Sequence, residues 1–333
     1  DALNVTLTIN PEPVLSSTLN ATVCSDVVSG ITLATAGGSV AASSYTINSI
    51  TVAAGLTAGG TNATTGTLKP SNAIVNDVFT NVTNAPLTVV YNVTPVTGGC
   101  LGNAVNVTLT VQPDPVVSTT LDATVCSDAV SGITLNTNGT SVSASNYTIN
   151  SITVAAGLIA GGTNATTGAG QAANAIVSDV FTNTSNGNLT VQYNVTPVSS
   201  SGCAGNAQTI TLTVRPEPVM SATLNASVCS DATSGITLNT NGTSVAASTY
   251  TLNSIAVASG LTPAVGNAVI GSGQASNAIV NDVFTNPTSG ALTVVYNVTP
   301  VSASGCLGDA LNVTLTINPE PVLSSTLNAT VCS

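Results

Sequence analysis

Apolar and polar residues alternate along several short stretches of the chain. Within residues 87–94, every second position from Leu87 to Val93 is apolar, and Thr and Asn occupy most of the positions between them. Residues 105–111 show the same pattern, with Thr and Asn between Val and Leu. A period of two predicts a strand that buries one face and exposes the other. Both stretches are therefore predicted strands.

Other segments are less regular but still strand-like. We predict further strands at residues 14–19, 30–33 and 45–52. The apolar phase shifts between Ile47 and Ile50, which predicts a β-bulge near Asn48. The spacing in residues 73–79 fits either a strand or a single helical turn, and we interpret it as a strand. Six or seven short strands in about 100 residues favour an immunoglobulin-like β-sandwich, so the predicted fold class is all-β.

The pattern returns three times along the chain. Cys24, Cys126, Cys229 and Cys332 follow one another at intervals of 102, 103 and 103 residues. The first 25 residues, DALNVTLTINPEPVLSSTLNATVCS, are repeated from Asp309 to Ser333. A period near 100 residues is too long for a solenoid and suits a chain of complete small domains. We therefore expect a stretch of a longer tandem array.

The repeat gives the expected domain organisation. Residues 1–13 are the last strand of a preceding repeat with its linker, and residues 322–333 are the first strand of the next repeat. Three β-sandwich repeats lie between them, at residues 14–115, 116–218 and 219–321.

A Pro-acid-Pro triplet marks each boundary between repeats. Proline fixes φ and restricts the residue before it, so these triplets predict short, stiff linkers and an extended rod. The four triplets are Pro11-Glu12-Pro13, Pro113-Asp114-Pro115, Pro216-Glu217-Pro218 and Pro319-Glu320-Pro321.

Composition excludes several classes of function. Only 5% of the residues are charged, the net charge is −11, and Lys69 and Arg215 are the two cations. Nucleic-acid binding and attachment to an anionic membrane both need clustered Lys and Arg. No apolar run reaches the roughly 18 residues of a spanning helix, so we expect no membrane insertion. The start has no signal-peptide pattern, and we expect any export signal to lie outside this stretch.

Seven cysteines in an acidic, strand-rich chain indicate disulfides formed outside the cytoplasm. We predict bonds within each repeat, Cys24–Cys100, Cys126–Cys203 and Cys229–Cys306, with Cys332 pairing in the next repeat. The alternative is pairing across the linker, as in Cys100–Cys126. One consideration opposes the first scheme, because a standard sandwich would place Cys24 and Cys100 at opposite poles.

Little in the chain points to catalysis. There is no His, so no Ser or Cys has an evident general base, and we expect no enzyme activity. Two series of Asp residues are interpreted as caps of turns through Asx hydrogen bonds. They are Asp26, Asp128 and Asp231, and Asp77, Asp179 and Asp282. We predict no cofactor, and a Ca²⁺ site at the linker acids Glu12, Asp114, Glu217 and Glu320 is the alternative.

The run from Val294 to Val322, VVYNVTPVSASGCLGDALNVTLTINPEPV, resembles the PKD-like repeats of giant bacterial proteins exported by the type IX secretion system. Related runs begin at Val89 and Val191. The resemblance is to cell-surface adhesins of the gliding-motility filament class (SprB type). It implies an array of β-sandwiches, export to the cell surface and a role in attachment or gliding. It supplies no catalytic residues.

We therefore expect the stalk of a long extracellular filament whose distal tip binds a surface or glycan ligand. The expected partners are neighbouring repeats and the gliding or secretion machinery at the cell surface. Two alternatives stay open: a multivalent array with weak glycan or calcium sites in each repeat, and a subunit of a surface layer or multi-chain filament.

Overall fold

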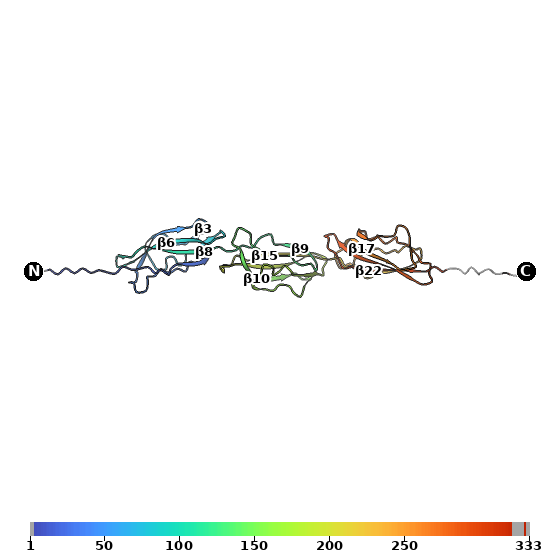
Figure 1. Cartoon of the computed structure of the whole chain (residues 1–333), viewed down its shortest axis with the longest axis horizontal. Helices are drawn as coiled ribbons and strands as arrows, with labels where there is room; N and C mark the ends of the chain where they lie inside the picture. Colours follow the sequence, from blue (N-terminus) through green and yellow to red (C-terminus); the bar gives the residue numbers. More distant parts are fainter. Residues whose placement is uncertain (1–2, 322–329, 331–333) are drawn as a thin grey trace.

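The computed structural model describes residues 3–321 and residue 330. Three β-domains follow one another along a single axis, with the first and third domains at the two ends of the rod (Figure 1). The described residues contain strands, turns and irregular segments, which confirms the predicted all-β class. No helix in these residues is long and apolar enough to span a bilayer. The predicted strand at residues 322–333 lies outside the described residues, apart from residue 330.

Each domain repeats the same order of strands, apart from the short strand β7, which is a strand in the first domain and a single bridge in the other two. The first domain contains β1 (Ala21–Cys24), β2 (Ser44–Val52), β3 (Leu56–Ala58), β4 (Gly66–Lys69), β5 (Phe79–Asn81), β6 (Leu87–Thr97), β7 (Cys100–Leu101) and β8 (Val105–Gln112). The second contains β9 (Ala123–Cys126), β10 (Ala144–Val154), β11 (Leu158–Ala160), β12 (Gly168–Gln171), β13 (Phe181–Asn183), β14 (Leu189–Ser199) and β15 (Gln208–Arg215). The third contains β16 (Ala226–Cys229), β17 (Ala247–Val257), β18 (Thr262–Pro263), β19 (Gly271–Gln274), β20 (Phe284–Thr285), β21 (Leu292–Ser302) and β22 (Leu311–Asn318).

The main sheet of the first domain has the order β1-β8-β6-β2-β4, and β7 pairs with β6. All of these pairs are antiparallel except β1 with β8, which run parallel. The parallel pair matters for the ends of the domain. Cys24, the last residue of β1, lies opposite Gln112, the last residue of β8. Cys24 therefore lies at the pole where the chain leaves the domain.

A second, less regular layer completes each sandwich. In the first domain it consists of the β3–β5 pair and of segments joined by isolated bridges, Leu15 with Thr35 and Val28 with Val78. Side chains from both layers form one buried cluster in each domain, and Tyr91, with none of its surface exposed, is among the largest side chains in the first. The corresponding clusters of the second and third domains are separate from it.

The strong alternation at residues 87–94 and 105–111 falls in β6 and β8, as predicted. The predicted bulge is also confirmed, because the register of β2 against β6 shifts between Ile47 and Ser49. Two other strand predictions are wrong. Residues 14–19 make one bridge at Leu15 before a turn, and residues 30–33 form no strand.

The segment 73–79 is also different from its prediction. Residues 71–76 form successive turns, in which Ala73 and Val75 donate backbone hydrogen bonds to residues three positions earlier. The spacing of apolar residues there matches a helical turn in which Ile74 is completely buried. The strand begins only at Phe79. The helical-turn alternative was therefore the better interpretation for most of this segment.

Candidate functional site

Four of the six described cysteines join neighbouring domains. Cys24 of the first domain is bonded to Cys203 of the second, and Cys126 of the second is bonded to Cys306 of the third. The bonded residues are 179 and 180 positions apart. Both predicted pairing schemes, within a repeat and between Cys100 and Cys126, are therefore wrong.

The positions of the strands explain the pairing. The parallel pairing of β1 with β8 places Cys24 at the exit pole of its domain. Cys203 follows β14 in the β14–β15 hairpin, at the entry pole of the second domain. The entry pole is identified by Gly205 of the same hairpin, which lies against the carbonyl of the linker residue Pro115. Facing poles of consecutive domains thus bring one cysteine from each domain together.

Two cysteines of the described residues carry free thiols. Cys100 is half-buried in β7, at the hairpin that corresponds to that of Cys203. Cys229 is exposed at the end of β16 and corresponds to Cys24 and Cys126. Cys332 lies outside the described residues.

The linkers are packed into the junctions. Both prolines of the 113–115 and 216–218 triplets are buried, and the acid between them is half-buried. By contrast, Glu12 and Glu320, in the first and last triplets, are exposed. A Cβ atom placed on Gly205 would lie 1.7 Å from the carbonyl oxygen of Pro115, and one on Gly308 would lie 1.8 Å from that of Pro218. These glycines allow the hairpin to rest directly on the linker backbone.

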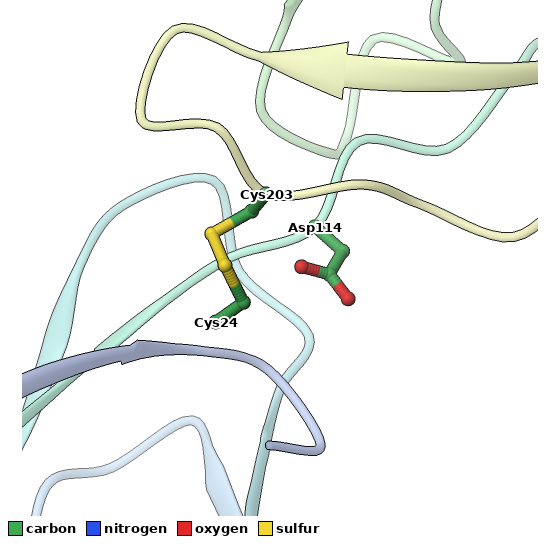
Figure 2. A group of neighbouring side chains, drawn as sticks. All are labelled: Cys24, Asp114 and Cys203. Carbon is green, nitrogen blue, oxygen red and sulfur yellow. A yellow bond between two sulfur atoms is a disulfide. The ribbon is translucent and has the colours of Figure 1, made fainter. Parts of the chain in front are cut away.

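The first junction places a carboxylate beside the disulfide. An oxygen of Asp114 and the sulfur atoms of Cys24 and Cys203 all lie within 4.8 Å of one another (Figure 2). The Oδ1 atom of Asp114 is buried and accepts no hydrogen bond. Burial, and then repulsion from the Asp26 carboxylate, raises the pKa of Asp114 to about 6. The two sulfurs are bonded to each other, so of this group only the carboxylate is available to a metal ion.

The second junction has a similar acid in a different setting. Burial, followed by repulsion from Asp128 and Asp309, raises the pKa of Glu217 to about 7. These three acids line one hollow of about 710 Å³ together with Cys126. No sequence pattern indicates that Asp309 lies near the linker acid, because Glu217 and Asp309 are 92 positions apart.

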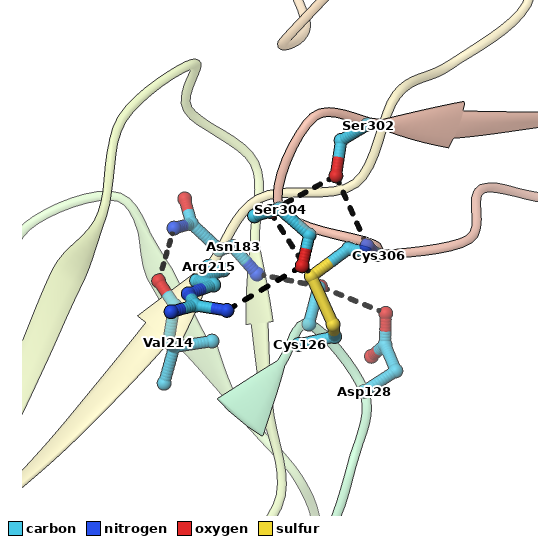
Figure 3. Close-up of a disulfide and its surroundings, with 9 residues drawn as sticks. Cys126, Asp128, Asn183, Val214, Arg215, Ser302, Ser304 and Cys306 are labelled. Carbon is cyan, nitrogen blue, oxygen red and sulfur yellow. Dashed lines mark hydrogen bonds between the residues drawn. A yellow bond between two sulfur atoms is a disulfide. The ribbon is translucent and has the colours of Figure 1, made fainter. Parts of the chain in front are cut away.

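A side-chain hydrogen bond also crosses the second junction. Arg215, the last residue of β15, donates from Nη1 to the carbonyl oxygen of Ser304 in the third domain, over 3.4 Å (Figure 3). The Ser304 hydroxyl lies 3.6 Å from the sulfur of Cys306 and donates to it. The corresponding residue of the first junction is Gln112, so the second junction alone of the two has a cation at this position.

The two Asp series are structural, but their predicted Asx turns are wrong. Asp77 is buried, accepts a hydrogen bond from the Tyr91 hydroxyl over 2.7 Å, and accepts another from the backbone of Ala63 over 2.8 Å. Asp26 has a left-handed backbone, with φ of 61°, and accepts a hydrogen bond from the Thr80 hydroxyl. Both carboxylates therefore bind segments distant in sequence. Asp179, Asp282, Asp128 and Asp231 make the equivalent contacts.

The fold and the junctions together define a class of protein: a tandem array of β-sandwich domains in which each neighbouring pair is joined both by the chain and by a disulfide. The family model described as "PKD-like domain" matches residues 21–115, 123–218 and 226–321. The chain therefore belongs to the PKD-like domain family and contains three copies of the domain.

Solved structures that match the chain include cadherin fragments. Mouse Cadherin-23 EC22-24 is 13% identical, with 94% of this chain and 100% of that chain covered and a TM-score of 0.26. Human CDH23 EC21-23 is 14% identical, with 92% of this chain and 99% of that chain covered and a TM-score of 0.27. Protocadherin Gamma B2 extracellular cadherin domains 1-5 is 11% identical, with 95% of this chain but only 61% of that chain covered and a TM-score of 0.24. No curated protein matches the chain. The family assignment rests on the PKD-like match alone.

Proposed function

We propose that this chain is a stalk segment of a long extracellular filament, in which repeated domains supply length and a distal tip supplies adhesion. The observation that carries the proposal is the double connection at each junction. A linker and a disulfide join the first domain to the second, and a second such pair joins the second domain to the third.

Two connections restrict a junction more than one. A single linker leaves neighbouring domains free to bend and twist about it, whereas a second covalent bond at another point of the same interface opposes both motions. The buried prolines of the 113–115 and 216–218 linkers add to this restriction because their φ angles are fixed. Force applied along such a rod passes from domain to domain through covalent bonds as well as through packing.

The composition supports an extracellular site of action. Disulfides persist in oxidising surroundings, and a surface that is solvated mainly by Thr, Ser and Asn suits a chain with only 5% charged residues. We infer a cell-surface location, with neighbouring repeats as structural partners. The surface or glycan ligand of the tip, and the gliding or secretion machinery at the base, are the proposed partners outside the repeats.

The stalk and the binding array predict different results in two measurements on the same protein. For the stalk, small-angle scattering gives one rod length for the oxidised protein, and the maximum dimension becomes broadly distributed after reduction. Calorimetry with Ca²⁺ and with a panel of glycans gives no saturable heat. The Cys229→Ser variant is the matched control, because it removes a thiol that forms no bond in the described structure.

A saturable heat with Ca²⁺ would favour the binding array instead, with the junction acids Asp128, Glu217 and Asp309 as the first residues to substitute. Unchanged scattering after complete reduction would contradict the structural role of the disulfides. A particle several domains wide at micromolar concentration would favour the surface layer or multi-chain filament.

A further inference from the structure

The Asp114 carboxylate has no structural partner that accounts for its position. Its Oδ1 atom is buried without a hydrogen-bond donor, and the charge next to it is the like charge of Asp26. These contacts destabilise an ionised side chain. What the carboxylate does contact is the disulfide, since one of its oxygens lies within 4.8 Å of both sulfur atoms (Figure 2).

Disulfides are reduced by thiolates, which are anions. A thiolate attacks one sulfur along the S–S axis, forms a mixed disulfide with it, and releases the other sulfur as a thiolate. A second thiolate then attacks the mixed disulfide. The net reaction oxidises two small thiols to one small disulfide and reduces the two cysteines to thiols. Negative charge approaches the bond in the first step and develops on the departing sulfur.

The two sulfurs differ in access. Cys203 is buried, with 1% of its surface exposed, whereas Cys24 is half-buried. Attack therefore takes place at Cys24, and the Cys203 sulfur departs into the protein. An ionised carboxylate within 4.8 Å of both atoms opposes both events, because it repels the incoming thiolate and the departing one.

We propose that Asp114 is an electrostatic guard of the Cys24–Cys203 bond, a residue whose negative charge slows thiol exchange and so keeps the junction closed when thiols are present. The guard acts when Asp114 is ionised. Because the pKa of Asp114 is about 6, its carboxylate is ionised at neutral and alkaline pH, where the attacking thiolates are also most abundant. The other charged group of this junction is the Asp26 carboxylate, which adds to the repulsion. Neither of the chain's two cations lies in the linker.

The test measures reduction of each bond separately, by quenching with an alkylating reagent and mapping peptides at pH 8 and low salt. Three thiols are used whose thiolates carry different charges: cysteamine (zero net charge), 2-mercaptoethanol (−1) and mercaptoethanesulfonate (−2). We expect Asp114→Asn to speed reduction of Cys24–Cys203 by 2-mercaptoethanol at least about fivefold, which is the effect of one unit charge at about 4 Å in water and is larger where the charge is partly buried. The gain should be larger for mercaptoethanesulfonate and smallest for cysteamine.

The molecule contains its own controls. The Cys126–Cys306 bond should keep its rate in Asp114→Asn, because it lies at the other junction. Glu320→Gln removes the same charge from the equivalent linker position, where the acid is exposed, and should change neither bond. Asp114→Glu keeps the charge and should keep the slow rate.

Two results would overturn the proposal. An equal acceleration by all three thiols would show that the substitution loosens the junction without any effect of charge. No acceleration of the Cys24–Cys203 bond, with the variant folded by its circular dichroism, would show that the carboxylate does not protect it.

Discussion

The two disulfides interlock, and this sets how far the chain can extend under load. In sequence order the four bonded cysteines are Cys24, Cys126, Cys203 and Cys306, and each bond skips over one cysteine of the other. Residues 24–126, 126–203 and 203–306 therefore run in parallel between the same two covalent links. The shortest of the three, residues 126–203, limits the extension even when every domain is unfolded.

The limit follows from the positions of the bonded residues. A separation of 77 positions, from Cys126 to Cys203, corresponds to a fully extended length of about 270 Å at roughly 3.5 Å per residue. Without the bonds, the 282 positions from Cys24 to Cys306 extend to about 990 Å. The maximum extension between Cys24 and Cys306 in the oxidised protein should therefore be less than a third of that in the reduced protein.

Single-molecule force spectroscopy with handles on the two ends of the chain measures this directly. We expect the total contour length released by the oxidised protein to be about 700 Å shorter than that released after reduction, the difference between the two lengths above. The Cys24→Ser/Cys126→Ser variant should behave as the reduced protein, and Cys229→Ser as the oxidised one. Equal contour lengths before and after reduction would refute the interlocked arrangement.

Three further results are expected. Gly205→Ala places a Cβ 1.7 Å from the Pro115 carbonyl oxygen and should cost about 2 kcal/mol or more in urea unfolding, while Gly187→Ala, with open space around its Cβ, should cost less than about 0.5 kcal/mol. Tyr193→Phe removes the hydroxyl donor of a buried carboxylate and should cost about 1–3 kcal/mol in the same assay. The pKa of Glu217 is raised from 4.5 to about 7 in the folded state. The contribution of this group to the thermal midpoint should therefore be greatest below pH 4.5 and be lost as the pH rises through 7. Glu217→Gln should flatten this pH dependence in calorimetry.

The alternation of residues predicted the main sheet well because that sheet buries one face. β6 and β8 each bury every second side chain, so the period of two is visible in the sequence. The second layer was harder to predict. Gly30 has a φ of 66°, and the segment after Pro70 turns on local hydrogen bonds. Neither segment therefore follows a strand period, although Ile31, Leu33 and Ile74 from these segments are core residues.

The cysteine pairing could not be read from spacing because it depends on two facts of tertiary structure. One is that β1 pairs in parallel with the last strand of its own domain, which moves Cys24 to the exit pole. The other is that the next domain presents its β14–β15 hairpin to that pole. The expectation that Cys24 and Cys100 lie at opposite poles was the one part of the sequence argument that pointed to the correct arrangement.

The spacing of the cysteines also shows which distances the junctions require. From each entry-pole cysteine to the next exit-pole cysteine along the chain there are 26 positions, from Cys100 to Cys126 and from Cys203 to Cys229. From exit pole to entry pole the separation varies, 76 positions from Cys24 to Cys100 and 77 from Cys126 to Cys203. The constant stretch contains the last strand of one domain, the linker and the first strand of the next, and it runs along the rod axis through both domains. The variable stretch ends in a hairpin, where one residue more or less changes a turn.

An inserted residue in the constant stretch would shift one cysteine along the rod by about 3.3 Å relative to its partner, and a disulfide tolerates little of such a shift. The segment that crosses the linker therefore sets how the two cysteines of a junction are aligned along the rod. This is the segment whose length, 26 positions, is the same at both junctions.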